Sequence, residues 1–95
     1  MIALNQNFDD LTITLDGGTF HGCTFTRCRL RFSGTLLPEL GGNRFDQCEW
    51  DFIGPAGMTL GFLQTLYHDQ GGVELVEKLF GAVRDRAPLT SIAVS

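Results

Sequence analysis

The sequence has no long apolar run, no closely paired cysteines and little positive charge. No stretch approaches the roughly 18 apolar residues of a membrane span, and residues 1–5 do not resemble a signal peptide. Its three cysteines form no CxxC pair, which argues against a disulfide framework and favours a reducing, cytoplasmic location. Seven basic and eleven acidic residues give a net charge of −4. We therefore expect neither a membrane nor a nucleic acid as partner.

Sequence motifs for catalysis and cofactor binding are also missing. No P-loop, dinucleotide fingerprint, GxSxG or HExxH pattern occurs. Cys23, Cys28 and Cys48 lie too far apart for typical zinc-binding pairs, which are two to four residues apart. Neither His21 nor His68 has an arguable catalytic partner. We expect a non-catalytic protein without a metal or cofactor.

A period of five residues is the main pattern that is present. Counting from residue 15, seven of eight positions five apart are Leu, Phe or Trp. Two residues before each lies a second, mostly small series, which contains all three cysteines. Residues two apart point to the same side of an extended strand, so both series predict the interior of a solenoid with a corner every five residues. The expected core residues are Leu15, Phe20, Phe25, Leu30, Leu40, Phe45, Trp50, Cys23, Cys28 and Cys48.

Three five-residue units carry a resemblance to a known family. Residues 23–27 (CTFTR), 28–32 (CRLRF) and 48–52 (CEWDF) resemble the units of pentapeptide-repeat proteins. The resemblance implies a right-handed, four-sided parallel β-helix with four units per coil, hence about two coils over residues 13–52. Thr35, Pro38 and Asn43 depart from the family pattern. Residues 33–43 are either an irregular face or a projecting loop.

The register makes a specific prediction about the outer surface. With about twenty residues per coil, residues twenty apart lie on adjacent rungs, roughly 4.8 Å apart. Arg29 is then beside Glu49 and Arg31 beside Asp51, which would form a ladder of opposite charges. These acidic neighbours also argue against nucleic-acid binding by the arginines.

The rest of the chain completes a single domain of residues 1–95, mainly β with two C-terminal α-helices. We expect residues 1–12 to form an N-terminal cap and lead-in strand, residues 53–87 a helical hairpin that caps the β-helix, and residues 88–95 a tail. The second helix has an apolar stripe at helical spacing. Together with two leucines before Pro38, it is the candidate interface: Val73, Val76, Leu79, Phe80, Val83, Leu36 and Leu37.

Three functions are compatible with these features. The first is a protein-interaction module that forms a homodimer through its C-terminal helices and binds an unknown protein partner. The second is small-ligand binding in a pocket between the helices and the last coil, lined by Trp50, Phe52, Tyr67 and His68. The third follows from the resemblance alone: some pentapeptide-repeat proteins mimic DNA and protect topoisomerases. We rank it last, because two coils and a charge of −4 make a poor mimic of a duplex.

Overall fold

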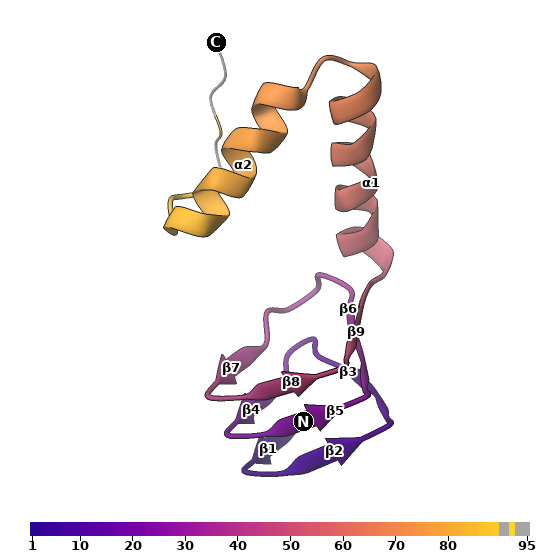
Figure 1. Ribbon diagram of the computed structural model, residues 1–95, viewed down its shortest axis with the longest axis vertical. Coiled ribbons are helices and arrows are strands. Elements are labelled where there is room, and N and C mark those ends of the chain that lie inside the picture. Colours follow the sequence, from indigo (N-terminus) through magenta and orange to yellow (C-terminus); the bar gives the residue numbers. More distant parts are fainter. Residues whose placement is uncertain (90–91, 93–95) are drawn as a thin grey trace. The chain divides into compact units, whose positions relative to one another are not determined.

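The computed structural model describes residues 1–89 and 92. The chain divides into two compact units, residues 1–58 and residues 59–95, which are described separately (Figure 1). Most of the expected tail, residues 88–95, lies outside the described residues. The first unit contains nine short strands: β1 (Ile2–Leu4), β2 (Asn7–Asp9), β3 (Thr12–Thr14), β4 (Thr19–His21), β5 (Thr24–Thr26), β6 (Arg29–Phe32), β7 (Glu39–Gly41), β8 (Arg44–Asp46) and β9 (Glu49–Phe52).

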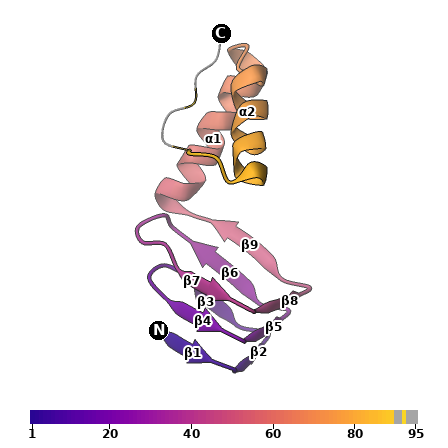
Figure 2. The same cartoon turned by 90° about the vertical axis from the view of Figure 1, so that its left-hand side faces the viewer.

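The strands form three parallel sheets, ordered β1-β4-β7, β2-β5-β8 and β3-β6-β9. The chain visits the three sheets in turn and then returns to the first. We call each pass a layer: layer 1 is β1–β3, layer 2 is β4–β6 and layer 3 is β7–β9 (Figure 2). The fold is therefore a mixed β/α one, and its stacked parallel strands are compatible with the expected β-helix.

The corners between strands explain the five-residue period. Asp10, Arg27 and Gln47 follow β2, β5 and β8, and all three have positive φ angles, of 56°, 50° and 53°. At the preceding corner the equivalent residues are Asn5, Gly22 and Gly42, also with positive φ. A three-residue strand followed by a corner with a left-handed residue uses five residues. The repeat is thus a repeat of backbone conformation as well as of buried side chains.

Residues 1–12 differ from the expected cap and lead-in strand. They contain β1 and β2, which pair with β4 and β5, so they form most of a further layer. Ile2 pairs with Thr19, 17 residues on, whereas Thr19 pairs with Glu39, 20 residues on. The connection after layer 1 is shorter than the one after layer 2, and this shifts the phase of the repeat. The residue that pairs with Leu30 is consequently Ile13.

The core lies inside layers 1 and 2. Phe20, Phe25 and Leu30 are at most 1% exposed and come from the middle of the three strands of layer 2. Burying side chains of this size contributes about 1.5–3 kcal/mol each. The whole buried cluster comprises Ala3, Ile13, Leu15, Phe20, Cys23, Phe25, Cys28 and Leu30, with Phe8 and Cys48 packed against it.

Two segments connect the layers without forming strands, residues 15–18 and 33–38. They are hydrogen bonded to each other: the Gly17 N–H donates to the Leu36 carbonyl at 3.0 Å, and the Ser33 N–H donates to the Asp16 carboxylate at 2.8 Å. Gly34, in the second segment, has a φ of 89°, a conformation that favours glycine. Residues 33–38 are therefore an irregular side of the stack, fastened at Asp16 and Gly17.

Two helices follow the strands: α1 (Gly54–Asp69) and α2 (Val73–Asp85). The Gly72 N–H donates to the Leu66 carbonyl at 2.7 Å and closes the end of α1. The end of α2 is closed by Arg86, with a φ of 57°, and by the Ala87 N–H, which donates to the Ala82 carbonyl at 2.9 Å. None of the helices in the described part of the chain is long and apolar enough to cross a membrane.

Candidate functional site

The inward-facing side chains of layer 3 are exposed, in contrast to those of layer 2. Leu40, Phe45 and Trp50 are 45%, 36% and 49% exposed, although each pairs with a side chain that is at most 1% exposed. We expected these three residues in the core. The sequence pattern correctly indicates the side of the strand on which they lie. They are exposed because β7, β8 and β9 are the last strands of their sheets among the described residues.

Aromatic rings form a column that ends at this surface. Phe25 stacks on Phe8 and on Phe45, with ring centroids 5.2 Å apart in both pairs. The Phe45 and Trp50 centroids are 5.0 Å apart, with the rings tilted by 58°. We call the exposed surface the open end of the stack and define it by Leu40, Phe45, Trp50 and Phe52. It combines apolar side chains with the free edges of three strands, a combination that favours binding of another chain.

The outer surface carries a ladder of ion pairs. The structure places Arg29 opposite Glu49 and Arg31 opposite Asp51. The nitrogen–oxygen distances are 3.0 Å for Arg29 and 3.6 Å for Arg31, whose Nε makes no hydrogen bond. Such exposed pairs stabilise a fold by at most about 1 kcal/mol. The pairs show that charged residues of opposite sign face each other across β6 and β9.

A further ion pair in the structure is not predicted by the twenty-residue spacing, because its residues are 18 apart. Arg27 Nη2 donates to Asp9 Oδ1 at 2.6 Å, between layer 2 and layer 1. The prediction of a cap over residues 1–12 leaves Asp9 outside the repeat and therefore gives Arg27 no partner. The signal that could have found it is a second five-residue series, Ala3, Phe8 and Ile13, which repeats the pattern in a shifted phase.

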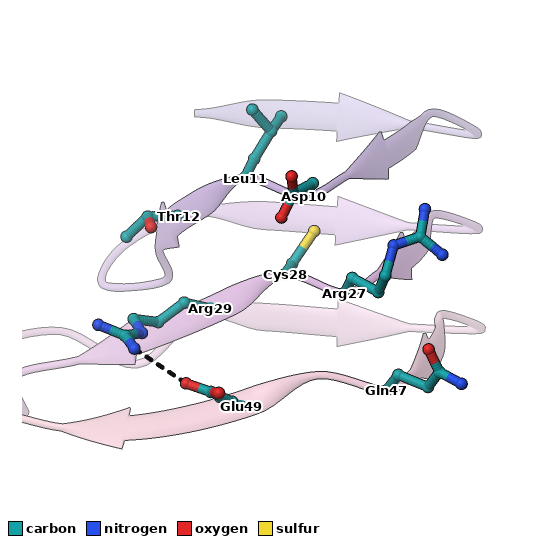
Figure 3. Close-up of a pocket in the computed structure, with 8 residues that line it drawn as sticks. All are labelled: Asp10, Leu11, Thr12, Arg27, Cys28, Arg29, Gln47 and Glu49. Carbon is teal, nitrogen blue, oxygen red and sulfur yellow. Dashed lines mark hydrogen bonds and ion pairs between the residues drawn. The ribbon is translucent and has the colours of Figure 1, made fainter.

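A surface pocket of about 340 Å³ lies at one corner of the stack (Figure 3). Two arginines and two acidic residues line it, so its charges balance. Both arginines already have carboxylate partners. The pocket therefore offers no excess positive charge for an anion and no nucleophile beside a histidine. Its lining residues are Asp10, Leu11, Thr12, Arg27, Cys28, Arg29, Gln47 and Glu49.

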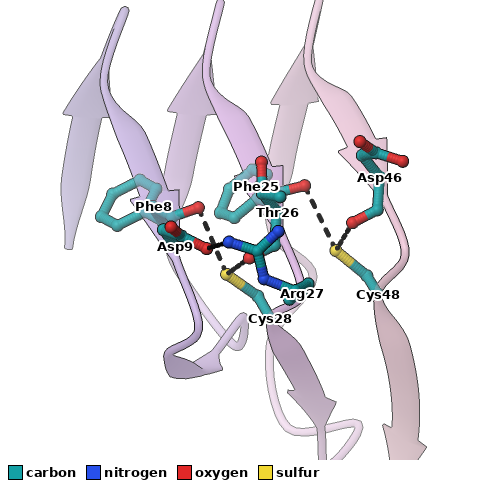
Figure 4. Close-up of polar contacts among 8 residues, drawn as sticks. All are labelled: Phe8, Asp9, Phe25, Thr26, Arg27, Cys28, Asp46 and Cys48. Carbon is teal, nitrogen blue, oxygen red and sulfur yellow. Dashed lines mark hydrogen bonds and ion pairs between the residues drawn. The ribbon is translucent and has the colours of Figure 1, made fainter.

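The cysteine thiols donate hydrogen bonds to backbone carbonyls (Figure 4). Cys28 Sγ lies 3.5 Å from the Phe8 carbonyl oxygen, and Cys48 Sγ lies 3.3 Å from that of Phe25. Cys23 makes the same contact with the Ala3 carbonyl at 3.4 Å. Each thiol thus bridges its own layer to the one beneath it. The described residues contain no group of three His, Cys, Asp or Glu side chains placed to hold a metal ion.

Asn43 occupies the same position as these cysteines, and its amide group likewise donates a hydrogen bond to a carbonyl of the layer beneath it. Its Nδ2 donates to the Phe20 carbonyl at 2.8 Å, and its Oδ1 accepts the Cys23 N–H at 2.8 Å. The family pattern made Asn43 a departure. In the structure it is a corner bridge between layers 2 and 3.

The stripe of α2 is the second exposed apolar surface. Val73, Phe80 and Val83 are 44%, 51% and 56% exposed, Leu79 is half-buried, and Val76 is buried. In α1, all of whose residues are described, no side chain is buried. The helical unit therefore has more apolar surface than it covers by itself.

The remaining candidate residues are separate from these surfaces. Leu36 and Leu37 are exposed on the irregular side of the stack. His21 Nε2 lies 3.8 Å from Glu39 Oε2 at the edge of layer 2. In α1 the Tyr67 and His68 rings lie 5.0 Å apart. They belong to the helical unit, whereas Trp50 and Phe52 belong to the strand unit, so a pocket shared by these four residues stays a prediction.

No protein-family model matches the chain, and the searches among curated proteins and solved structures likewise gave no match.

Proposed function

We propose that this chain is a non-catalytic protein-interaction module that forms a homodimer through α2. One observation carries the proposal: three of the five apolar stripe residues of α2, Val73, Phe80 and Val83, are 44–56% exposed. Monomeric proteins rarely leave several large apolar side chains of one helix face in water, because burying them is favourable by about 25 cal/mol per Å². A second copy of the same helix offers a matching surface in a two-fold arrangement.

The charges of α2 favour an antiparallel pair. Glu74 lies in its first turn and Arg84 in its last turn. In an antiparallel two-fold pair each arginine faces the glutamate of the other copy, whereas a parallel pair brings like charges together. A helix of 13 residues is about 20 Å long, enough for the whole stripe to take part.

The strand unit serves in this proposal as a rigid scaffold, a right-handed four-sided β-helix of the pentapeptide-repeat type. Within layers 2 and 3 the strands begin five residues apart, at Thr19, Thr24 and Arg29 and again at Glu39 and Arg44, which supports it. The irregular segment 33–38 is the fourth side. A right-handed course agrees with the strong preference of parallel crossover connections. The reduced thiols of this scaffold suit the cytoplasm, where we place the protein.

The experiment is a measurement of mass in solution, with the untagged protein in reducing buffer. We expect sedimentation equilibrium to give a dimer for the natural chain and a monomer for Phe80→Glu, since a charge in the stripe cannot be buried without a partner. Ile2→Glu is the matched control: it places the same charge at an exposed apolar residue of the strand unit and leaves the dimer intact. Circular dichroism checks that both variants are folded. A natural chain that stays monomeric at about 100 μM, or a dimer that Phe80→Glu does not change, contradicts the proposal.

A further inference from the structure

The charges of the strand unit alternate from layer to layer. Layer 1, residues 2–14, has two acidic residues and no basic one; layer 2, residues 19–32, has three arginines and no acidic residue. Layer 3, residues 39–52, has four acidic residues and one arginine. All the ion pairs between layers in the described residues follow this order, with the cation in layer 2. They are Arg27–Asp9, Arg29–Glu49, Arg31–Asp51 and His21–Glu39.

Layer 3 is the last layer among the described residues, so its acidic side chains have a basic layer on one side only. Strand β9 presents Glu49 and Asp51 on its outer side and Trp50 and Phe52 on the other, and Trp50 and Phe52 are about half exposed. The Glu49 N–H donates to the carbonyl of Cys28, the residue before β6, and the Ile53 N–H donates to that of Phe32, the last residue of β6. Because successive residues of a strand direct their N–H and C=O groups to opposite edges, those of Trp50 face away from β6.

We infer that the open end is the binding site of a partner protein that adds an extended strand to β9, with basic residues alternating with large apolar ones. The chain contains its own template for such a strand. β6 has the sequence Arg-Leu-Arg-Phe and pairs in parallel with Glu-Trp-Asp-Phe of β9, in the register Arg29–Glu49, Leu30–Trp50 and Arg31–Asp51. A partner strand of this kind repeats the contacts on the other edge of β9: apolar residues on Trp50 and Phe52, and cations beside the carboxylates.

The same charges disfavour a second copy of this chain at the open end. Two copies of β9 side by side place the carboxylates Glu49 and Asp51 beside the same carboxylates of the other copy. Layer 3 against layer 1 in the existing register places Asp46 opposite Asp9, since Phe8, Phe25 and Phe45 form one column. Like charges directly opposite each other destabilise a strand pair. The inferred partner is thus a different protein, and the site is independent of the α2 dimer proposed above.

β9 is the best of the three free edges for this purpose. β8 carries Arg44 and Asp46, opposite charges that favour no single sign in a partner. β7 ends in Gly41, and its one charged residue is Glu39. β9 alone has two carboxylates on one side and two aromatic rings on the other, and it has four residues where β7 and β8 have three.

The test uses the full chain and a labelled peptide that carries the sequence of β6, Arg29–Phe32, between flanks of glycine and serine. Trp50 is the chain's one tryptophan and the peptide has none, so a change in tryptophan fluorescence reports binding at the open end. We expect a saturable change with the β6 peptide. We expect none with a peptide in which glutamate replaces both arginines, and none with a scrambled peptide of the same composition.

The matched variants locate the site. Glu49→Gln combined with Asp51→Asn keeps the shape of β9 and removes both carboxylate charges, so the peptide should bind about tenfold more weakly. Asp10→Asn combined with Asp69→Asn removes two charges elsewhere and should bind as tightly as the natural chain. Amide hydrogen exchange provides a second readout, because a paired strand protects the Trp50 N–H.

Several results would overturn the inference. These are equal binding of the scrambled or acidic peptide, equal weakening by the two double variants, or no fluorescence change up to about 1 mM peptide. Trp50 fluorescence that depends on protein concentration without peptide would instead assign the open end to a second copy.

Discussion

The carboxylate of Asp16 holds Ser33 by two hydrogen bonds, one from the backbone N–H at 2.8 Å and one from the hydroxyl at 2.8 Å. The same carboxylate accepts from the Gly34 N–H at 3.1 Å and from the N–H and hydroxyl of Thr35 at 3.0 and 2.9 Å. Five donors therefore converge on one side chain, on the side of the stack that has no strands. Asp16 takes over here the role that strand pairing has in the three sheets.

Asp16→Asn should lower the stability of the strand unit. An amide has one acceptor oxygen in place of two, and its NH₂ group faces donors that it cannot satisfy. The expected result is a lower urea midpoint at pH 7 with an unchanged m-value, measured by Trp50 fluorescence. Asp85→Asn, an exposed acidic residue of α2, is the control and should leave the midpoint unchanged. Equal midpoints for the two variants would show that the Asp16 hydrogen bonds add nothing.

Asp16 should also make the stability of this unit sensitive to acid. The Ser33 N–H, helped by the Ser33 hydroxyl and by Thr35, outweighs partial desolvation and holds the pKa of the Asp16 carboxyl well below its usual range. Its folded pKa is depressed, so its contribution is complete above the unfolded pKa of about 3.9 and is lost as the pH falls below that value. The difference in urea midpoint between the natural chain and Asp16→Asn should shrink between pH 5 and pH 2. A difference that stays constant over this range would contradict the assignment.

Strand pairing can be predicted from the sequence where the five-residue repeat is regular. A twenty-residue spacing places Arg29 beside Glu49 and Phe25 beside Phe45, the partners that the structure has. The two helices are visible because their apolar residues have helical spacing and because Gly71 and Gly72 separate them. These features follow from local geometry, which a single sequence contains.

Features that depend on distant partners were not visible. Layer 1 was missed because residues 15–18 form a shorter connection than 33–38, so counting back by five from Phe20 reaches Leu15 and passes over Ile13. The exposure of Trp50 was missed because periodicity shows where a side chain points and does not show what covers it. Asp16 has no periodic signal at all, since its partners lie 17 to 19 residues away.

Asn43→Ala should destabilise the strand unit more than a typical surface substitution. It removes the acceptor of the Cys23 N–H and the donor to the Phe20 carbonyl, both at a half-buried corner. Leaving such groups unpaired costs about 1–3 kcal/mol. Asn7→Ala, at an exposed position of β2, is the matched control and should change the free energy of unfolding by at most about 0.5 kcal/mol. Equal effects of the two substitutions would show that the Asn43 hydrogen bonds do not stabilise this corner.

Two phenylalanines of the aromatic column should differ sharply in how much they contribute to the free energy of unfolding. Phe25 is fully buried between Phe8 and Phe45, so Phe25→Ala should cost about 3–5 kcal/mol, which leaves little of the stability of a chain of this size. Phe45→Ala should cost distinctly less, since Phe45 lies at the open end. Urea unfolding at 10 °C and 25 °C provides the comparison. A larger loss for Phe45→Ala would mean that the open end is covered in solution.

The three thiols should react with a disulfide reagent in a defined order. Cys23 and Cys28 are 1% exposed, whereas Cys48 is only partly buried in layer 3. Cys48 should therefore react first, through local opening of the last layer, and the other two only from the equilibrium population in which the whole strand unit is unfolded. Cys48→Ser isolates the slow pair, and the dependence of their rate on urea should match the global m-value. Fast labelling of Cys23 or Cys28 at low urea would mean that layers 1 and 2 open without unfolding, which contradicts a single core built from Phe20, Phe25 and Leu30.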